Sequence, residues 1–154
     1  MALPYEVVAT LLAPGAWVTI ADAAEPALDA DVLGSLAGEG GALVALGARR
    51  VAWRGSGDSV VVARGRGGAM LGCAEGASRI PVAPMLATGL QGADVDASAS
   101  LVLDVPSGAI AISTTAEGSA PMRVEVSSKR VVVRRARLAM GRDGAVVACV
   151  LAPA

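Results

Sequence analysis

The sequence predicts a mainly β fold (β-rich α+β), with antiparallel sheets or a sandwich and two short helices, in one domain spanning residues 1–154. Glycine and proline separate short valine-rich runs along the whole chain, which is typical of β-dominated domains. Hydrophobic residues make up 54% of the chain and include no Phe, so the core must be built largely from small branched side chains that favour strands. A chain of 154 residues can bury such a core without disulfides or metals.

Several strands and one short helix are expected in the first half of the chain. A helix is predicted from Asp29 to Leu36, because an aspartate can cap its start, apolar residues follow at helical spacing and Gly38 can end it. The stretch from Gly55 to Asp58 is predicted as a hairpin turn between two strands. The predicted strands are Tyr5–Leu12, Trp17–Ile20, Ala42–Leu46, Arg50–Arg54, Ser59–Arg64 and Ala69–Cys73.

The second half is expected to follow a similar outline. A helix is predicted from Pro84 to Leu90, because proline is tolerated in the first turn, where its missing N–H costs nothing. Two hairpins are predicted, one turning at Pro106 to Gly108 and one at Gly141 to Gly144. The predicted strands are Arg79–Val82, Leu101–Val105, Ala109–Ser113, Met122–Val126, Arg130–Leu138 and Ala145–Leu151.

Each half therefore places a strand, a short helix and further strands in the same order, which divides the chain into two halves, 1–76 and 77–154. This order resembles one domain of a DNA sliding clamp, which is built from two strand-helix-strands units. The resemblance covers most of the chain and depends on element order alone, without a diagnostic motif. It implies a ring-shaped oligomer that associates with DNA.

The chain contains no histidine, which excludes Ser-His-Asp and Cys-His catalysis and the commonest zinc sites. Gly57 to Ser59 resembles a serine-nucleophile block but has no histidine to activate it, and Ser127 to Lys129 is interpreted as a polar bend rather than a serine–lysine dyad. Gly65 to Gly68 lacks the lysine and spacing of a phosphate loop and is interpreted as a strand connection. We therefore expect a protein that is not an enzyme, with no catalytic residue, cofactor or metal.

The remaining polar and sulfur-containing candidates have structural interpretations. Asp94 and Asp96 lack the further ligands of a calcium loop and are expected in a solvated loop. Asp22, Asp29 and Asp31 are expected to cap or precede the first helix. Cys73 and Cys149 are expected as buried small hydrophobes, and Trp53 as a large part of one apolar cluster.

Charge is distributed unevenly along the chain, although the formal net charge is only −1. Residues 1–48 contain six acidic residues and no basic one, whereas residues 123–142 contain seven basic residues and only one acidic residue, Glu125. Basic side chains on both faces of one strand predict that this strand is a sheet edge or faces another subunit. The candidate interaction residues are Lys129, Arg130, Arg134, Arg135 and Arg137.

These observations predict a non-enzymatic protein–protein assembly or adaptor module. It could be a structural subunit of a homomeric particle, including a phage or viral particle, so the expected partner is another protein or further copies of this chain. The alternative is a sliding-clamp-like, DNA-associated protein, since an arginine-rich strand can contact phosphates. No membrane helix and no secretory signal are visible in the sequence, and the expected compartment is the cytoplasm.

Overall fold

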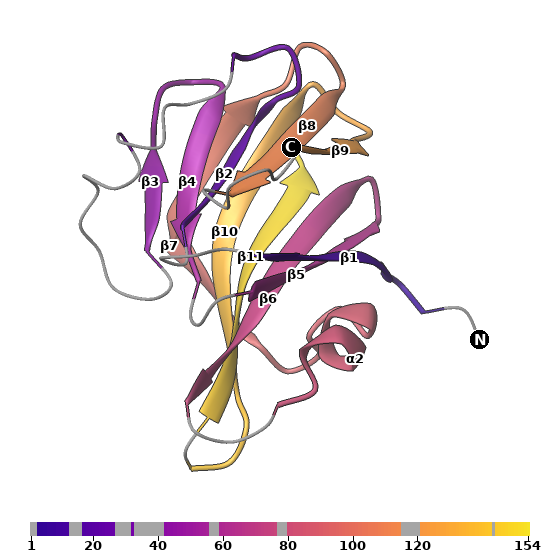
Figure 1. Ribbon diagram of the computed structural model, residues 1–154, viewed down its shortest axis with the longest axis vertical. Helices are drawn as coiled ribbons and strands as arrows, with labels where there is room; N and C mark the ends of the chain where they lie inside the picture. Colours follow the sequence, from indigo (N-terminus) through magenta and orange to yellow (C-terminus); the bar gives the residue numbers. More distant parts are fainter. Residues whose placement is uncertain are drawn as a thin grey trace.

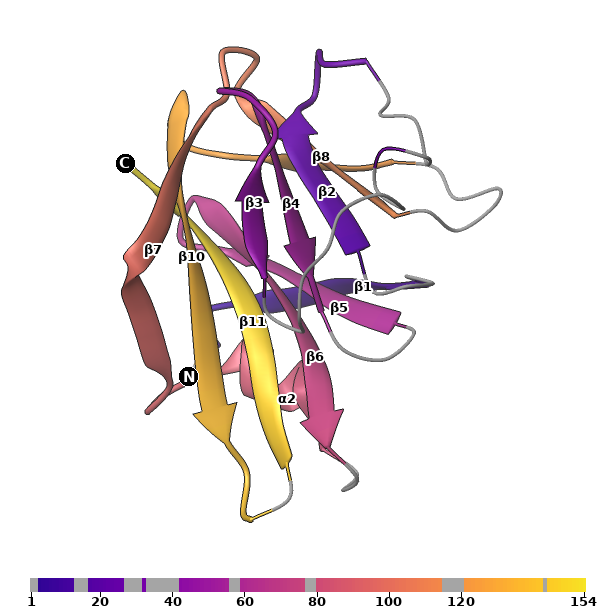
Figure 2. The same cartoon turned by 90° about the vertical axis from the view of Figure 1, so that its left-hand side faces the viewer.

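The computed structural model is a two-layer sandwich of antiparallel sheets, which confirms the predicted β-rich fold class (Figure 1). It describes residues 3–12, 17–26, 32, 42–55, 59–76, 80–114, 121–142 and 144–154, without the side chains of residues 95–99. The side view shows the two layers facing each other, with several strands of one layer running on beyond the other (Figure 2).

The larger layer is a six-stranded sheet in the order β1-β5-β6-β11-β10-β7. All of its neighbouring strands run antiparallel, and β1 carries a bulge between Val7 and Ala9. Its strands are β1 (Glu6–Leu12), β5 (Ser59–Gly65), β6 (Gly68–Gly76), β7 (Asp94–Asp104), β10 (Arg130–Ala139) and β11 (Gly144–Pro153).

The smaller layer is a five-stranded antiparallel sheet in the order β3-β4-β2-β8-β9. Its central strand, β2, is buried along its whole length: it has a neighbour on either side, Val18 and Ile20 face the other sheet, and Trp17 packs with Ala52 on the opposite face. Its strands are β2 (Trp17–Asp22), β3 (Leu43–Ala45), β4 (Arg50–Arg54), β8 (Ala109–Thr114) and β9 (Met122–Glu125).

The inner faces of the two sheets share one apolar core. The core-facing positions follow the two-residue period of a strand, so Val131 and Val133 of β10 are fully buried while Arg134 is exposed. Trp53 of β4 is the largest fully buried side chain among the described residues and lies in this core, as predicted. Cys73 and Cys149 are buried here and are not linked in a disulfide, which confirms their predicted role as small hydrophobes.

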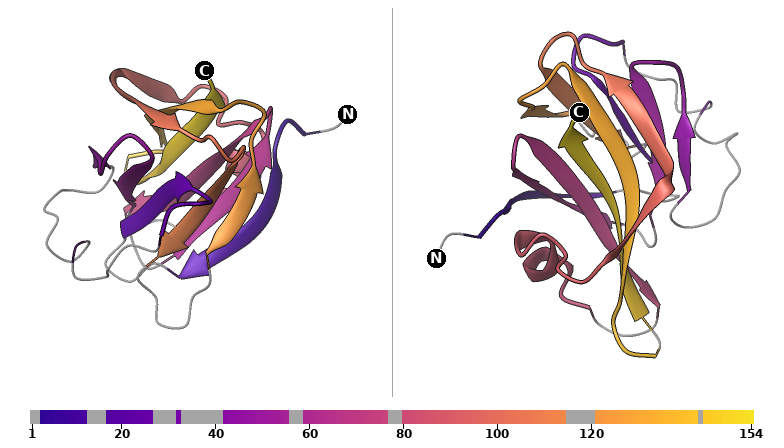
Figure 3. Two further views of the ribbon diagram at one scale, coloured as in Figure 1. Left: turned by 90° about the horizontal axis from the view of Figure 1, so that it is seen from above. Right: turned by 180° about the vertical axis from the view of Figure 1, so that it is seen from behind.

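One short helix, α2 (Val82–Ala87), lies on the outer face of the six-stranded sheet (Figure 3). Its fully buried residue Leu86 packs over Gly72 of β6, where a Cβ atom would lie only 2.8 Å from the Cδ2 atom of Leu86. The missing side chain of Gly72 therefore lets the helix approach the sheet closely. The helix begins two residues before its predicted start, and the predicted strand Arg79–Val82 is wrong at its described residues, because Pro81 precedes α2 directly and offers no backbone N–H.

Two predicted hairpins are wrong, because their strands belong to different sheets. Strands β7 and β8 lie in opposite layers, and so do β4 and β5 on either side of Gly55. The apolar faces of both strands in each pair point into the common core from opposite layers. The turn at Ser107 does form where predicted, and it connects the layers. The hairpin between β10 and β11 is confirmed.

Asp22 fixes the connection between β7 and β8. Its buried carboxylate accepts hydrogen bonds from the Ser107 backbone N–H (3.0 Å), the Ser107 hydroxyl (2.6 Å) and the Ala24 N–H (3.1 Å). Asp22 therefore stabilises a corner of the sandwich. The predicted helix Asp29–Leu36 lies outside the described residues except for Val32.

The strand pairing of the first half recurs in the second. In the first half β5 lies between β1 and β6, and β2 pairs with β4. In the second half β10 lies between β7 and β11, and β8 pairs with β9. The two sets meet where β6 pairs with β11 and β2 pairs with β8. The division of the chain into halves stays a prediction, and the repeated pairing order supports it.

Replacing Trp53 by alanine should lower the free energy of unfolding by about 3–5 kcal/mol, because it removes the largest fully buried side chain and leaves a cavity. Denaturant unfolding measures the loss. The control is Trp53→Phe, which keeps most of the ring volume and removes an indole N–H that has no hydrogen-bond partner among the described residues. A loss below about 1 kcal/mol for Trp53→Ala would contradict the core role of the indole.

Acid should weaken the fold through Asp22. Burial raises the pKa of Asp22, but the hydrogen bonds from Ser107 and Ala24 and the charge of Arg49 outweigh it and hold the pKa below its usual range. The ionised carboxylate therefore contributes stability above the unfolded pKa of about 3.9, and this contribution is lost as the pH falls through the lowered native pKa. Unfolding curves from pH 7 to pH 2 should show the stability gap between wild type and Asp22→Asn narrowing with acid. A constant gap would contradict this assignment.

Candidate functional site

The arginine-rich segment lies in the interior of a sheet. Strand β10 pairs with β11 on one side and β7 on the other, so the prediction of an edge strand is wrong. Val131 and Val133 of this strand are fully buried in the core between the two sheets. Basic residues can occupy core-side positions farther along, because β10 and β11 run on past the smaller sheet (Figures 1 and 2).

Three of these arginines lie opposite aspartates of the neighbouring strand β7 in the backbone register. Arg130 lies opposite Asp104 and forms an ion pair with it at 3.4 Å. Arg135 and Arg137 lie opposite Asp96 and Asp94 in the backbone register. The prediction that these two aspartates lie in a loop is therefore wrong, since both belong to β7. Opposite charges placed across neighbouring strands stabilise their pairing.

The remaining candidate residues are either ion-paired or half-buried, or exposed without an ion pair in the described part of the chain. Arg137 also forms an ion pair with Glu75 at 3.5 Å, and Arg135 is half-buried. Lys129 and Arg134 are exposed, and neither has an ion pair within the described part of the chain. The described acidic residues of the N-terminal part do not pair with this basic segment. Glu6 forms an ion pair with Arg64, Glu25 forms one with Arg49, and Asp22 accepts a hydrogen bond from Ser107.

A polar hollow of about 320 Å³ lies at the far end of the six-stranded sheet. Glu75, Arg137, Arg142 and three glycines line much of it. Because Glu75 already pairs with Arg137, the hollow carries mixed charge and offers no strong preference for an anion or a cation.

The four sheet edges differ in how they are protected against further strand pairing. Strand β7 carries three aspartates, β9 has Arg123 and Glu125 among its four residues, and β3 is only three residues long. Charge and shortness both deter the addition of another strand. Strand β1 is seven residues long and contains a single charged residue, Glu6 at its start, so its bulge is its main protection.

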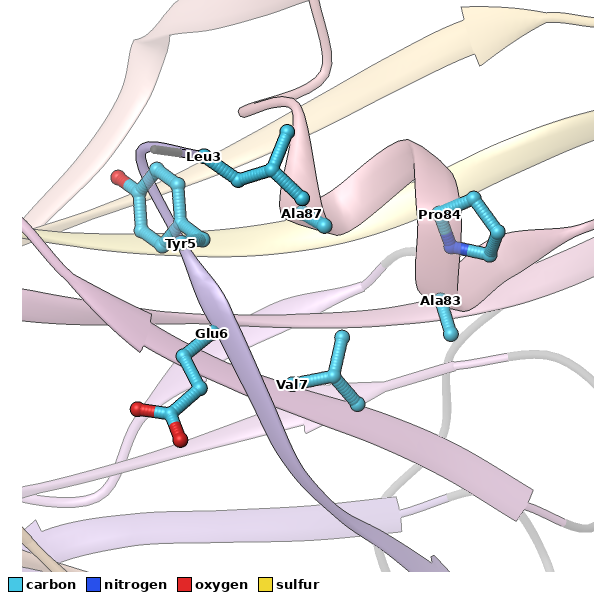
Figure 4. A pocket seen from close by; sticks show the side chains of 7 residues that line it. All are labelled: Leu3, Tyr5, Glu6, Val7, Ala83, Pro84 and Ala87. Carbon is cyan, nitrogen blue, oxygen red and sulfur yellow. The ribbon is translucent and has the colours of Figure 1, made fainter. Parts of the chain in front are cut away.

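An apolar groove of about 500 Å³ runs between β1 and α2 (Figure 4). Leu3, Tyr5 and Val7 line it from the N-terminal segment, and Ala83, Pro84 and Ala87 line it from the helix, with Glu6 at its border. The Tyr5 N–H donates a hydrogen bond to the Ala87 carbonyl at 3.3 Å, which fixes the helix beside the strand. Small residues on the helix keep the groove open.

Apolar side chains remain exposed along this edge. Leu3, Val7 and Leu12 are 62%, 37% and 68% exposed. Val7 and Leu12 lie on the outer face of the sheet, because they pair with Ala63 and Ser59, on the same side as α2. The sequence predicted the strand Tyr5–Leu12 but not its place at an edge. The uncharged run from Val7 to Leu12 is the signal that could have drawn attention to it.

The other predicted elements are consistent with structural roles. Gly65 to Gly68 forms the tight connection between β5 and β6, with positive φ angles at Arg66 and Gly67. Ser127 to Lys129 forms a bend between β9 and β10. Within the described ranges, no three acidic or cysteine side chains gather in a way that could hold a metal ion. None of the described helices is long and apolar enough to span a membrane.

Comparison with known proteins gives no match: no family model, no curated protein and no solved structure is similar to this chain.

Charge reversal should separate the two kinds of arginine. Arg134→Glu should change the free energy of unfolding by no more than about 0.5 kcal/mol, because the side chain is exposed and makes no ion pair within the described residues. Arg135→Glu should cost about 1–3 kcal/mol, because it puts a half-buried carboxylate opposite Asp96. The two variants carry the same change in charge, so each controls for the other in thermal or denaturant unfolding. Equal losses would contradict the cross-strand pairing.

Proposed function

We propose that this chain is a non-enzymatic protein–protein assembly module that binds an extended strand at the open edge of β1. The observation that carries the proposal is a strand edge with a single charged residue and no neighbouring strand among the described residues, lying directly beside an apolar groove. An extended segment that adds to a sheet edge gains main-chain hydrogen bonds, and pockets beside the edge select its alternate side chains. Both features meet here.

The groove would determine which side chains the bound segment can carry. A strand placed along β1 directs every second side chain to the outer face, where Val7 and Ala83 offer apolar surface. Burying an aliphatic side chain there removes it from water together with the exposed apolar atoms of Leu3 and Val7. The favoured partner is therefore a segment with apolar residues at alternate positions and few charges.

The sliding-clamp alternative gains no specific support. The arginines that suggested phosphate contact lie mostly opposite aspartates of β7, which leaves Lys129 and Arg134 as exposed basic residues without an ion pair in the described part. We propose the cytoplasm as its compartment, because Cys73 and Cys149 are buried thiols outside a disulfide and would stay reduced there.

A displayed library of random linear peptides, selected at low protein concentration, tests the proposal. The enriched peptides should alternate apolar residues, and their affinity should fall about tenfold or more for Ala83→Glu, which puts a charge into the groove. Glutamate near the start of α2 is compatible with the helix dipole, so the variant should fold. The control Gln91→Glu adds the same charge at an exposed position outside the groove and should bind as wild type. Failure to enrich any peptide, or equal binding by both variants, would overturn the proposal.

A further inference from the structure

We infer that the strand bound at this edge is β1 of a second copy, so that the chain forms a twofold dimer with a continuous sheet across the two copies. This inference rests on the proposed function, because it names the occupant of the same edge and groove. A twofold interface presents the same patch on both copies, and the patch must therefore be complementary to itself.

The edge of β1 is complementary to itself in shape. Its C-terminal end carries Leu12, which is 68% exposed, and its N-terminal end borders the groove formed with α2. When two copies of β1 lie antiparallel, each end faces the opposite end of the other strand. The exposed leucine of each copy then meets the apolar groove of the other, and both are buried at once.

The faces of the strand select one register. Thr10 and Leu12 pair with Val61 and Ser59 on the outer side of the sheet, whereas Ala9 and Leu11 pair with the core residues Val62 and Val60. Opposite residues of an antiparallel pair share a face. The register that places outer residues opposite outer residues sets Thr10 against Val7 of the second copy and Leu12 against Tyr5. Leu12 then lies diagonally beside Leu3 and Val7, which line the groove.

Electrostatic repulsion does not prevent the two β1 strands from pairing. Glu6 is the one charged residue in β1, and Arg64 pairs with it at 3.3 Å within the same copy. In the inferred register Glu6 lies opposite Leu11 of the second copy, so the two Glu6 carboxylates do not face each other. The edge therefore lacks the like-charge repulsion that protects other sheet edges from self-association.

Sedimentation equilibrium on the full chain tests the dimer. Wild type should be dimeric at tens of micromolar, and Leu12→Lys should raise the dissociation constant about tenfold or more, because it puts a charge where a leucine would be buried. The control Val102→Lys makes a similar change at a 50% exposed valine on β7, the opposite edge strand, and should remain dimeric. Circular dichroism checks that both variants fold.

Cysteine cross-linking tests the register. A mixture of Val7→Cys and Thr10→Cys chains should form an interchain disulfide on mild oxidation, because opposite residues bring their Cα atoms to about 4.5–5.5 Å. Thr10→Cys alone should not cross-link, because its two copies would be roughly 7 Å apart along the strand, in addition to the spacing between the two strands. The native cysteines Cys73 and Cys149 are buried and should not take part.

The outcomes separate this inference from the proposed function. A wild-type chain that stays monomeric at several hundred micromolar overturns the dimer, and peptide selection then decides the proposed function independently. A dimer that survives Leu12→Lys and gives no cross-link in the mixed sample uses another surface and also overturns the inference. Loss of the dimer with Leu12→Lys alone, together with the mixed cross-link, supports it.

Discussion

The structure depends on one apolar interface between two sheets, filled mainly by small branched side chains around a single indole. With no Phe in the chain, Trp53 is the largest fully buried side chain described, and Val, Leu and Ile residues from both sheets surround it. Small side chains must interdigitate closely to reach the density of a protein interior. This requirement fixes which face of every strand points inward, at the edges of the sheets as well as in their interior.

The same requirement explains the placement of charge. Strand β10 lies between β11 and β7 and contributes Val131 and Val133 to the core, although it also carries several arginines. An interior strand with arginines needs acidic neighbours, and β7 provides aspartates in register. Part of the uneven charge along the sequence becomes local pairing in the fold, as between Arg130 and Asp104 and between Glu6 and Arg64.

The sheet edges are the surfaces most relevant to function, because each outermost strand has a neighbour on only one side among the described residues. Charged residues guard β7 and β9, and β3 is short, whereas β1 presents a largely uncharged edge beside the groove closed by α2. The helix can lie so close because Gly72 leaves room for Leu86. The groove is thus a consequence of close packing on one face of the sheet.

The sequence by itself determined the fold class, most strands and the burial of Trp53 and the two cysteines, because hydrophobic alternation and turn residues are local signals. It could not determine which strands are neighbours. The stretches at Ser107 and Gly55 carry the turn residues of a hairpin, yet they join opposite sheets. The arginines of β10 suggested an edge because their acidic partners on β7 become visible only in the register. The groove beside β1 joins Val7 to Ala83, residues far apart in the chain. Tertiary structure decided these features, since strand pairing and edge position depend on how all the apolar faces share one core.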